Sequence, residues 1–144
     1  MPYDQTFDIL LVEDDPGDAG LTRAALAQAK LVCKLHHVCD GVEALEFLRK
    51  KGPHQGAPTP HLVLLDLNMP RMGGREVLEV MRADPDMQKI PVVVLTTSDV
   101  EADIEASYQL GANSFITKPV DIDQFIESVK AMGDYWFSIV RLPS

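Results

Sequence analysis

Long apolar runs and an excess of positive charge are both missing from this sequence of 144 residues. No apolar stretch reaches the roughly 20 residues that a membrane-spanning helix needs, and residues 1–6 lack the basic and apolar regions of a signal peptide. Lys and Arg number 13 against 22 Asp and Glu, so the formal net charge is −9. Nucleic acids and anionic membrane surfaces are bound mainly through Lys and Arg. The charge therefore argues against both as direct partners, and the length fits one domain.

Cysteine and histidine are too few, and too far apart, to indicate a disulfide or a transition-metal site. The only cysteines are Cys33 and Cys39. On a strand spanning residues 33–39 they lie about 20 Å apart, whereas a disulfide needs Cα atoms within about 7 Å. We therefore expect buried, reduced thiols and a cytoplasmic location. His36 and His37 alternate across the same strand, so they cannot both face one metal ion.

Helical and strand-like patterns alternate along the chain. Short apolar runs predict strands at residues 7–13, 33–39, 61–65, 92–95 and 113–117. Periodicity and capping residues predict helices at residues 18–31, 40–49, 74–83, 98–110 and from 121 to 136, with a Pro/Gly-rich loop at 51–60. Right-handed crossovers place such helices on both faces of a parallel sheet. The predicted fold class is α/β, with a doubly wound parallel sheet.

The helix patterns also predict caps and buried faces. The segment Asp40-Gly41-Val42-Glu43 has the form of a capping box. For the first helix, the small apolar faces are predicted to come from Leu21, Ala24, Ala25, Leu26 and Ala29. For helix 74–83, the inward side chains are predicted to be Val77, Leu78 and Met81.

Four of the predicted strands end in side chains that can do chemistry. Glu13 and Asp14 follow the first strand, Asp66 ends the third, Thr96 ends the fourth and Lys118 follows the fifth. The carboxyl ends of parallel strands share one edge of a sheet, where ligands bind. We therefore expect these side chains to meet there, with the chemistry on Asp66.

The three carboxylates of this group call for a cation. Glu13, Asp14 and Asp66 would repel one another, and one would take up a proton unless a positive ion lay between them. A hard divalent ion with oxygen ligands is the natural solution. Mg²⁺ takes one or two carboxylates, several waters and phosphate oxygens. The interpretation of these acids as a solvated turn and a helix cap is the weaker alternative.

These residues, in this order and at these spacings, resemble the receiver domain of the two-component response regulators. The resemblance covers residues 7 to about 133 and implies the flavodoxin-like (βα)5 strand order 2-1-3-4-5. It makes Asp66 the phosphoacceptor and a phosphohistidine of a sensor histidine kinase the donor. Spacing from Pro91 selects Thr96 over Thr97 as the functional hydroxyl. A regulator of this kind is not an enzyme in the usual sense, although it catalyses its own phosphorylation and dephosphorylation.

The resemblance also implies how the site is assembled. Asp14, Asp66 and the backbone carbonyl of Asn68 bind Mg²⁺ directly, Glu13 acts through water, and Mn²⁺ can substitute. Lys118 pairs with a phosphoryl oxygen, and a cis peptide before Pro119 aims its side chain.

A conformational switch follows from the same resemblance. Phosphorylation adds negative charge and acceptors, which draw Thr96 toward the phosphoryl group. Phe115 then turns inward and changes the face built from the fourth helix, the fifth strand and the fifth helix. An ordinary core phenylalanine explains Phe115 nearly as well, and both interpretations stay open.

The end of the chain carries an aromatic cluster. Residues 134–144 run past the usual end of a receiver, and Tyr135, Trp136 and Phe137 are consecutive. On a helix they point in three directions, and exposed apolar patches of this kind mark interfaces. This ending and Asp14–Asp18 resemble the stand-alone regulators paired with bacterial and cyanobacterial phytochrome kinases. We expect a homodimer; the alternative is a helix that packs on its own domain.

Other functions fit the residues less well. Only Ser144 follows Pro143, so we expect a single-domain regulator that acts on a downstream target or a phosphotransfer protein yet to be identified, rather than on DNA. A pseudo-receiver would not need the acids, Thr96 and Lys118. A phosphatase of the haloacid dehalogenase type needs a second acid at position 68, where Asn68 cannot donate a proton. A flavodoxin-like FMN site would be repelled by the acids after the first strand.

Overall fold

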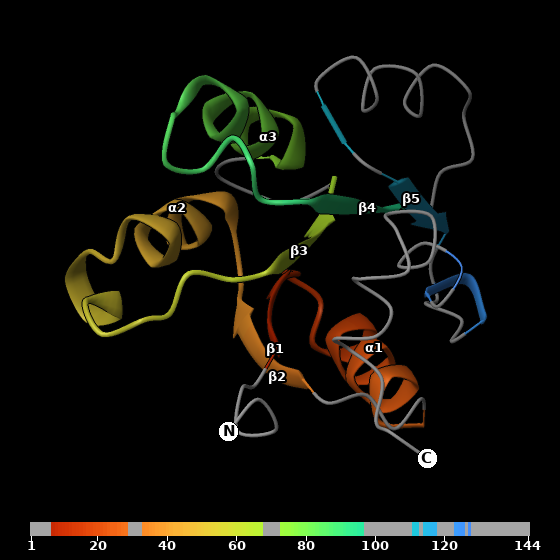
Figure 1. Cartoon of the computed structure of the whole chain (residues 1–144). Coiled ribbons are helices and arrows are strands. Elements are labelled where there is room, and N and C mark those ends of the chain that lie inside the picture. The colour runs from red at the N-terminus through yellow and green to blue at the C-terminus, as the bar shows by residue number, and fades with distance from the viewer. Residues whose placement is uncertain are drawn as a thin grey trace, which may run out of the picture.

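Strands and helices follow one another in the computed structural model, which describes residues 7–28, 33–67, 73–96, 111–112, 114–117, 123–125 and 127 (Figure 1). The strands are β1 (Phe7–Val12), β2 (Cys33–Val38), β3 (Leu62–Asp66), β4 (Val92–Thr96) and β5 (Ser114–Thr117). The helices are α1 (Pro16–Gln28), α2 (Gly41–Arg49) and α3 (Gly74–Ala83), with a 3₁₀ turn at Gly52–His54. Residues 123–125 and 127 are helical as well. Within these ranges, no helix is long and apolar enough to cross a membrane.

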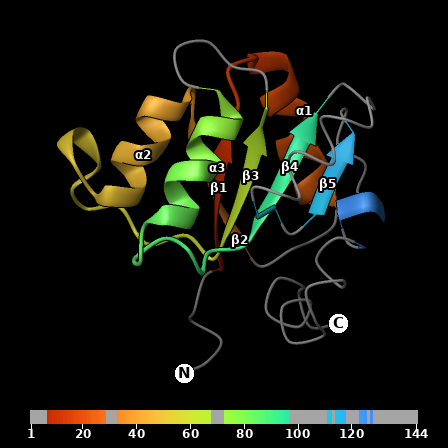
Figure 2. The ribbon, with the colours of Figure 1, turned by 90° about the horizontal axis from the view of Figure 1, so that it is seen from above.

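The strands form one parallel sheet in the order β2-β1-β3-β4-β5. This confirms the predicted fold class and strand order. Helices α2 and α3 cover one face of the sheet, and α1 covers the other (Figures 1 and 2). A parallel sheet needs cover on both faces, because its strands are apolar on both sides.

Side chains alternate between the two faces and form two cores. The α1 side holds odd-numbered residues of β1, including Ile9 and Leu11, against Ala25 and Leu26. The other side is built from Leu10, Val12, Val63, Leu65, Val92 and Val94, packed against Val77, Leu78 and Met81. All three of these α3 residues are fully buried, as predicted. The uninterrupted apolar runs in the sequence therefore reflect burial of both faces of each strand.

Local hydrogen bonds explain where α1 and α2 begin. The Asp15 carboxylate accepts from the backbone N–H groups of Gly17 (2.7 Å) and Asp18 (3.1 Å), so α1 starts at Pro16, two residues before the predicted start. Asp40 accepts from the Glu43 N–H at 2.8 Å, which confirms the capping box. Glu43 reaches back to the N–H of Cys39, at 2.9 Å, one residue before the cap.

Three burial predictions are wrong. Cys39 is an unpaired, exposed thiol, because it follows the last residue of β2 where the chain turns into α2. Leu21 is 53% exposed and Ala24 is exposed as well, because the buried face of α1 is formed by Ala19, Thr22, Ala25 and Leu26.

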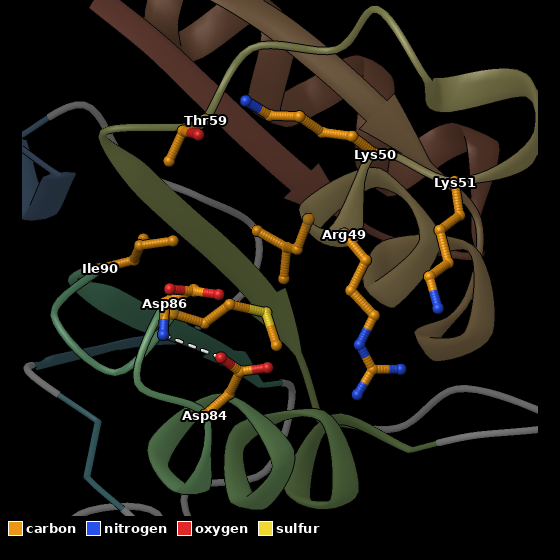
Figure 3. A pocket seen from close by; sticks show the side chains of 9 residues that line it. Arg49, Lys50, Lys51, Thr59, Asp84, Asp86 and Ile90 are labelled. Atoms are coloured by element: carbon orange, nitrogen blue, oxygen red, sulfur yellow. Dashed lines mark hydrogen bonds between the residues drawn. The ribbon is translucent and has the colours of Figure 1, made fainter.

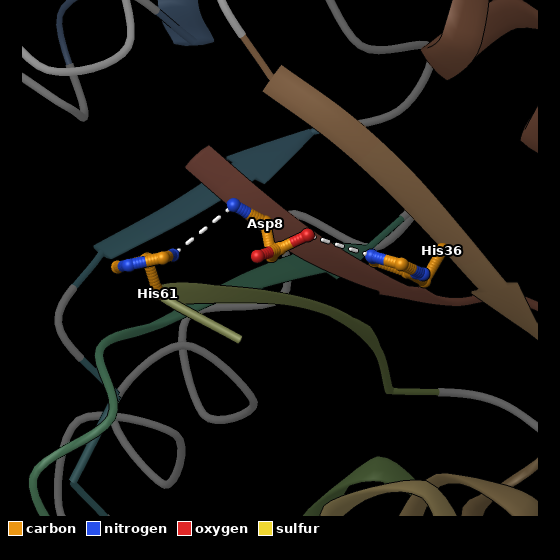
Figure 4. Close-up of polar contacts among 3 residues, drawn as sticks. All are labelled: Asp8, His36 and His61. Carbon is orange, nitrogen blue, oxygen red and sulfur yellow. Dashed lines mark hydrogen bonds and ion pairs between the residues drawn. The ribbon is translucent and has the colours of Figure 1, made fainter. Parts of the chain in front are cut away.

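The two neighbouring histidines of β2 serve different faces of the sheet. His36 Nε2 lies 2.9 Å from an Asp8 carboxylate oxygen, and the Asp8 N–H donates to His61 Nδ1 at 3.1 Å (Figure 4). The His37 ring instead contacts the carbonyl oxygen of Glu13 at 2.8 Å. The two rings therefore have different partners, as their alternation along β2 predicted.

Arg82 ties the end of α3 to two other segments. Its Nε and Nη2 atoms donate to the carbonyl oxygen of Gly111 at 3.0 and 2.7 Å, and Nη1 donates to Gln88 and Ile90 carbonyls at 2.8 and 2.9 Å. Burial lowers the pKa of the Arg82 guanidinium from its usual value, yet an arginine keeps its charge. Gly111 has φ of 101°, and a Cβ there would lie 2.7 Å from Arg82 Nε.

We expect Arg82→Met to lower the free energy of unfolding by about 2–3 kcal/mol, because charge-assisted hydrogen bonds to backbone carbonyls are lost. Urea unfolding followed by circular dichroism measures the change. Arg23→Met, at an exposed position of α1, is the control and should stay within about 0.5 kcal/mol of the parent protein. Equal losses in the two variants would contradict this role for Arg82.

Candidate functional site

The carboxyl ends of β1 and β3 bring the acids together. Val12 pairs with Leu65 in the parallel ladder, so the next residues, Glu13 and Asp66, leave the sheet at the same level. Carboxylate oxygens of Glu13, Asp14 and Asp66 all lie within 4.8 Å of one another. The structure therefore assembles the three acids that the sequence predicted to meet at this edge.

The acids differ sharply in exposure. Glu13 is fully buried and Asp66 is 2% exposed, whereas Asp14 is exposed. Carboxylates this close together repel one another, and an intervening cation removes that repulsion. The donor set consists of oxygen atoms alone, as Mg²⁺ prefers, and the exposed Asp14 side leaves access for water and phosphate. The residues present therefore fit a hard divalent ion.

The backbone of Glu13 is held tightly by β2. Its N–H donates to the Val38 carbonyl oxygen at 3.0 Å, and its own carbonyl oxygen accepts from His37 Nε2 at 2.8 Å. One Glu13 carboxylate oxygen also accepts from the Asp15 N–H at 3.3 Å. Sequence reasoning missed the contact of His37, because a strand pattern predicts the face of a side chain and not its partner.

The backbone of Leu67, directly after Asp66, is held by β4 and by the start of α3. The Leu67 N–H donates to the Leu95 carbonyl, and the Gly74 N–H donates to the Leu67 carbonyl, each at 3.2 Å. A Cβ on Gly74 would collide with the carbonyl oxygen of Asp66 and lie 2.8 Å from Leu67 Cα. Only glycine allows α3 to begin this close to the acid. The sequence signal for this approach was the Gly73-Gly74 pair directly before the helical pattern.

The remaining predicted residues are described only in part. Thr96 ends β4 as predicted, and its backbone pairs with Thr117 of β5, but its side chain lies outside the described part of the structure. Asn68, Lys118 and Pro119 also lie outside the described residues, as does the segment that contains Tyr135, Trp136 and Phe137. Their assigned roles stay predictions.

The burial of Phe115 does not decide between a switch residue and an ordinary core phenylalanine. It pairs with Val94 in the ladder and packs, partly buried, against the core on the α2 and α3 side of the sheet. Phe125, by contrast, is fully buried on the α1 side. Phe115 is therefore not sealed in the core, and its role as a switch stays a prediction.

A separate hollow of about 490 Å³ lies far from the acids in the fold. Basic side chains from the end of α2, Arg49 and Lys51, line one wall, and Asp84 and Asp86 line the other (Figure 3). Helices that cross back over a parallel sheet end beside the amino ends of the strands. The hollow therefore belongs to the edge opposite the acids, and none of the predicted site residues lines it.

We expect Gly74→Ala to lower the free energy of unfolding by about 1–3 kcal/mol, because the added methyl group must displace the backbone around Asp66. Gly73→Ala is the matched control. Its Cβ would meet Leu67 O at an ordinary 3.6 Å, and its φ of −76° suits any residue. Urea unfolding measures both variants. If they unfold at the same denaturant concentration, the close approach of α3 does not require glycine.

Comparisons with known proteins agree with this geometry. The chain matches the family model of the response regulator receiver domain over residues 9–130. It is 40% identical over 136 residues to response regulator Rcp1 of Synechocystis sp., covering 94% of this chain and 92% of Rcp1. The structure of the Mn²⁺-bound form of Rcp1 has a TM-score of 0.75, with 95% of this chain and 99% of that chain covered.

Two phytochrome response regulators of known structure are also similar. The bacteriophytochrome response regulator AtBRR has a TM-score of 0.83 at 40% identity, covering 90% of this chain and 94% of that chain. The phosphorylated cyanobacterial phytochrome response regulator RcpA has a TM-score of 0.79 at 43% identity, covering 97% and 100%. The predicted likeness to regulators of this type is confirmed. Receiver domains bind Mg²⁺, which the cluster of Glu13, Asp14 and Asp66 fits. The chain belongs to the response regulator receiver domain family, whose members are generally non-catalytic modules of two-component signalling.

Proposed function

We propose that this protein is a response regulator that accepts a phosphoryl group on Asp66 in a Mg²⁺-dependent reaction. The observation that carries the proposal is the position of Asp66, buried at the end of β3 with the Glu13 and Asp14 carboxylates within 4.8 Å. A carboxylate so placed serves as a nucleophile once the surrounding negative charge is neutralised. Phosphoryl transfer needs mainly this positioning and charge neutralisation.

In the proposed reaction, an oxygen of Asp66 attacks the phosphorus of a phosphohistidine. The bond from phosphorus to the imidazole nitrogen breaks, and an aspartyl phosphate forms while the imidazole leaves. Asp14, Asp66 and the Asn68 carbonyl would hold Mg²⁺, with Glu13 acting through water, and the ion would supply positive charge for the phosphoryl oxygens. The Lys118 ammonium pairs with one of these oxygens, and the Thr96 hydroxyl donates a hydrogen bond to another.

The donor we propose is a sensor histidine kinase of the phytochrome type, which acts in the cytoplasm. Support comes from three phytochrome-associated or Rcp1-like regulators at 40–43% identity over at least 90% of this chain. The net charge of −9 fits a protein partner better than nucleic acid.

The proposed output is a change of shape rather than a second reaction. Thr96 ends β4, and Phe115 lies on β5, which pairs with β4. We expect movement of the Thr96 hydroxyl toward a phosphoryl group to shift the adjacent strand that carries the Phe115 ring. The partial burial of Phe115 supports a ring that can move further inward. A downstream target or phosphotransfer protein would then recognise the altered face.

The test of the phosphoacceptor is direct. We expect incubation with acetyl phosphate and Mg²⁺ to add one phosphoryl group, measured as an intact mass. Asp66→Asn should abolish the adduct, because its amide is no nucleophile, and a chelator should abolish it as well. Asp86→Asn, at an exposed acid of the opposite edge, is the matched control and should be labelled normally.

Two results would count against the phosphoacceptor. An adduct that persists in Asp66→Asn would assign the chemistry to another residue. The absence of any adduct, from acetyl phosphate and from a phosphorylated histidine kinase alike, would favour a pseudo-receiver that acts by interaction alone.

The proposed homodimer rests on residues 134–144 and has its own test. Replacing Tyr135, Trp136 and Phe137 with serine should convert the dimer to a monomer, because the interface loses its aromatic anchors. Size-exclusion chromatography with light scattering measures the mass in solution. A parent protein that is monomeric at all concentrations would mean that the aromatic residues pack on their own domain.

A further inference from the structure

The peptide that joins Glu13 to Asp14 is held by a side chain that lies outside the acidic cluster. The carbonyl oxygen of Glu13 accepts a hydrogen bond from the Nε2 atom of His37 at 2.8 Å. A carbonyl oxygen can only accept, so Nε2 carries the proton in this contact. His37 is partly buried on β2, where it pairs with Leu11 of β1.

This contact extends the hold of β2 on β1 past the end of the sheet. The last pair of the ladder is Val12 with Val38, and one further backbone bond joins the Glu13 N–H to the Val38 carbonyl at 3.0 Å. After Val38 the chain turns into α2, which Asp40 caps. The His37 ring therefore donates to Glu13 where the backbone of β2 has turned away.

The orientation of Asp14 depends on that same peptide. The Glu13 carbonyl, the Asp14 N–H and the Asp14 Cα lie in one rigid plane, so holding the oxygen fixes the position of the Asp14 Cα from which the side chain starts. The Asp14 carboxylate is exposed, and it makes no hydrogen bond or ion pair within the described ranges of the chain. Its backbone is therefore what aims it at Glu13 and Asp66.

We propose that His37 is a positioning residue for the metal site: by holding the Glu13–Asp14 peptide, it sets the affinity of the acidic cluster for Mg²⁺. This inference rests on the proposed function of Glu13, Asp14 and Asp66. His37 touches neither the ion nor the phosphoryl group in this arrangement. Loss of residues that orient metal ligands typically weakens metal affinity by about 10–100-fold.

His36 provides a matched control on the same strand. It points to the opposite face, where its Nε2 atom lies 2.9 Å from the Asp8 carboxylate (Figure 4). Asp8 lies near the start of β1, whereas the acidic cluster follows the end of that strand. A substitution of His36 therefore removes a histidine contact to β1 without touching the Glu13–Asp14 peptide.

The experiment compares Mg²⁺ titrations, by calorimetry, of the parent protein and of His37→Phe, His37→Gln and His36→Gln. We expect His37→Phe, which lacks a donor, to raise the Kd for Mg²⁺ about 10-fold. Glutamine keeps an N–H donor, so His37→Gln should restore most of the affinity, and His36→Gln should match the parent protein. At saturating Mg²⁺, the labelling rate of His37→Phe with acetyl phosphate should return to the parent value, because His37 only positions a ligand.

The outcomes separate this inference from the proposed function. Unchanged Mg²⁺ affinity in a folded His37→Phe variant would overturn the inference alone, as would a loss in His37→Gln equal to that in His37→Phe. A parent protein that neither binds Mg²⁺ nor is labelled would overturn both. Circular dichroism reports folding. If His37→Phe does not fold, His37→Leu, which also lacks a donor, takes its place in the same comparison.

Discussion

The parallel pairing of β1 with β3 is the constraint on which the site depends. It places Glu13 and Asp66 side by side at one edge of the sheet, both almost fully buried. Two carboxylates in that position repel each other, and a cation bound between them removes that repulsion. The two apolar cores bury both faces of the same strands and so stabilise the sheet that carries the acids. The sheet therefore keeps the acids in a place where they bind a metal ion readily, because little further ordering is needed on binding.

The site is supported mainly through the backbone. Gly74 lets α3 begin against the Asp66 carbonyl, and the Gly74 N–H bonds to the next residue, Leu67. On the other side, β2 holds Glu13 through the Val38 carbonyl and the His37 ring. Neighbouring elements therefore hold the peptides beside the acids. Asp14 gains most from this arrangement, because its exposed carboxylate has few neighbours to orient it.

Local sequence patterns predicted the strands and helices, whereas contacts between distant segments could not be predicted from any one pattern. The apolar runs of β1, β3 and β4 predicted the strands, because burial on both faces leaves an uninterrupted pattern. The Asp40 and Glu43 capping box predicted α2 for a local reason. The strand order and the roles at the site came from resemblance, because pairing between strands is not written in any one segment. Leu21 and Cys39 were misplaced since apolar character alone does not say which side of a helix or of a strand end is covered. His37 and Gly74 were missed because their partners lie 24 and 8 positions away along the chain, beyond the reach of any periodic pattern.

The acids at the sheet edge and the residues that hold their peptides differ in how freely they can be substituted. Under the proposed function, the acids themselves cannot change without loss of the nucleophile or of the metal ligands. The residues that hold their peptides can change, since they touch neither the ion nor the phosphoryl group. His37 lies on β2, at the margin of the sheet, where one side chain can be exchanged while the core between β1 and β3 stays intact. If His37 has the positioning role proposed above, exchange of this residue would adjust the metal concentration at which phosphorylation proceeds without altering the proposed chemistry at Asp66.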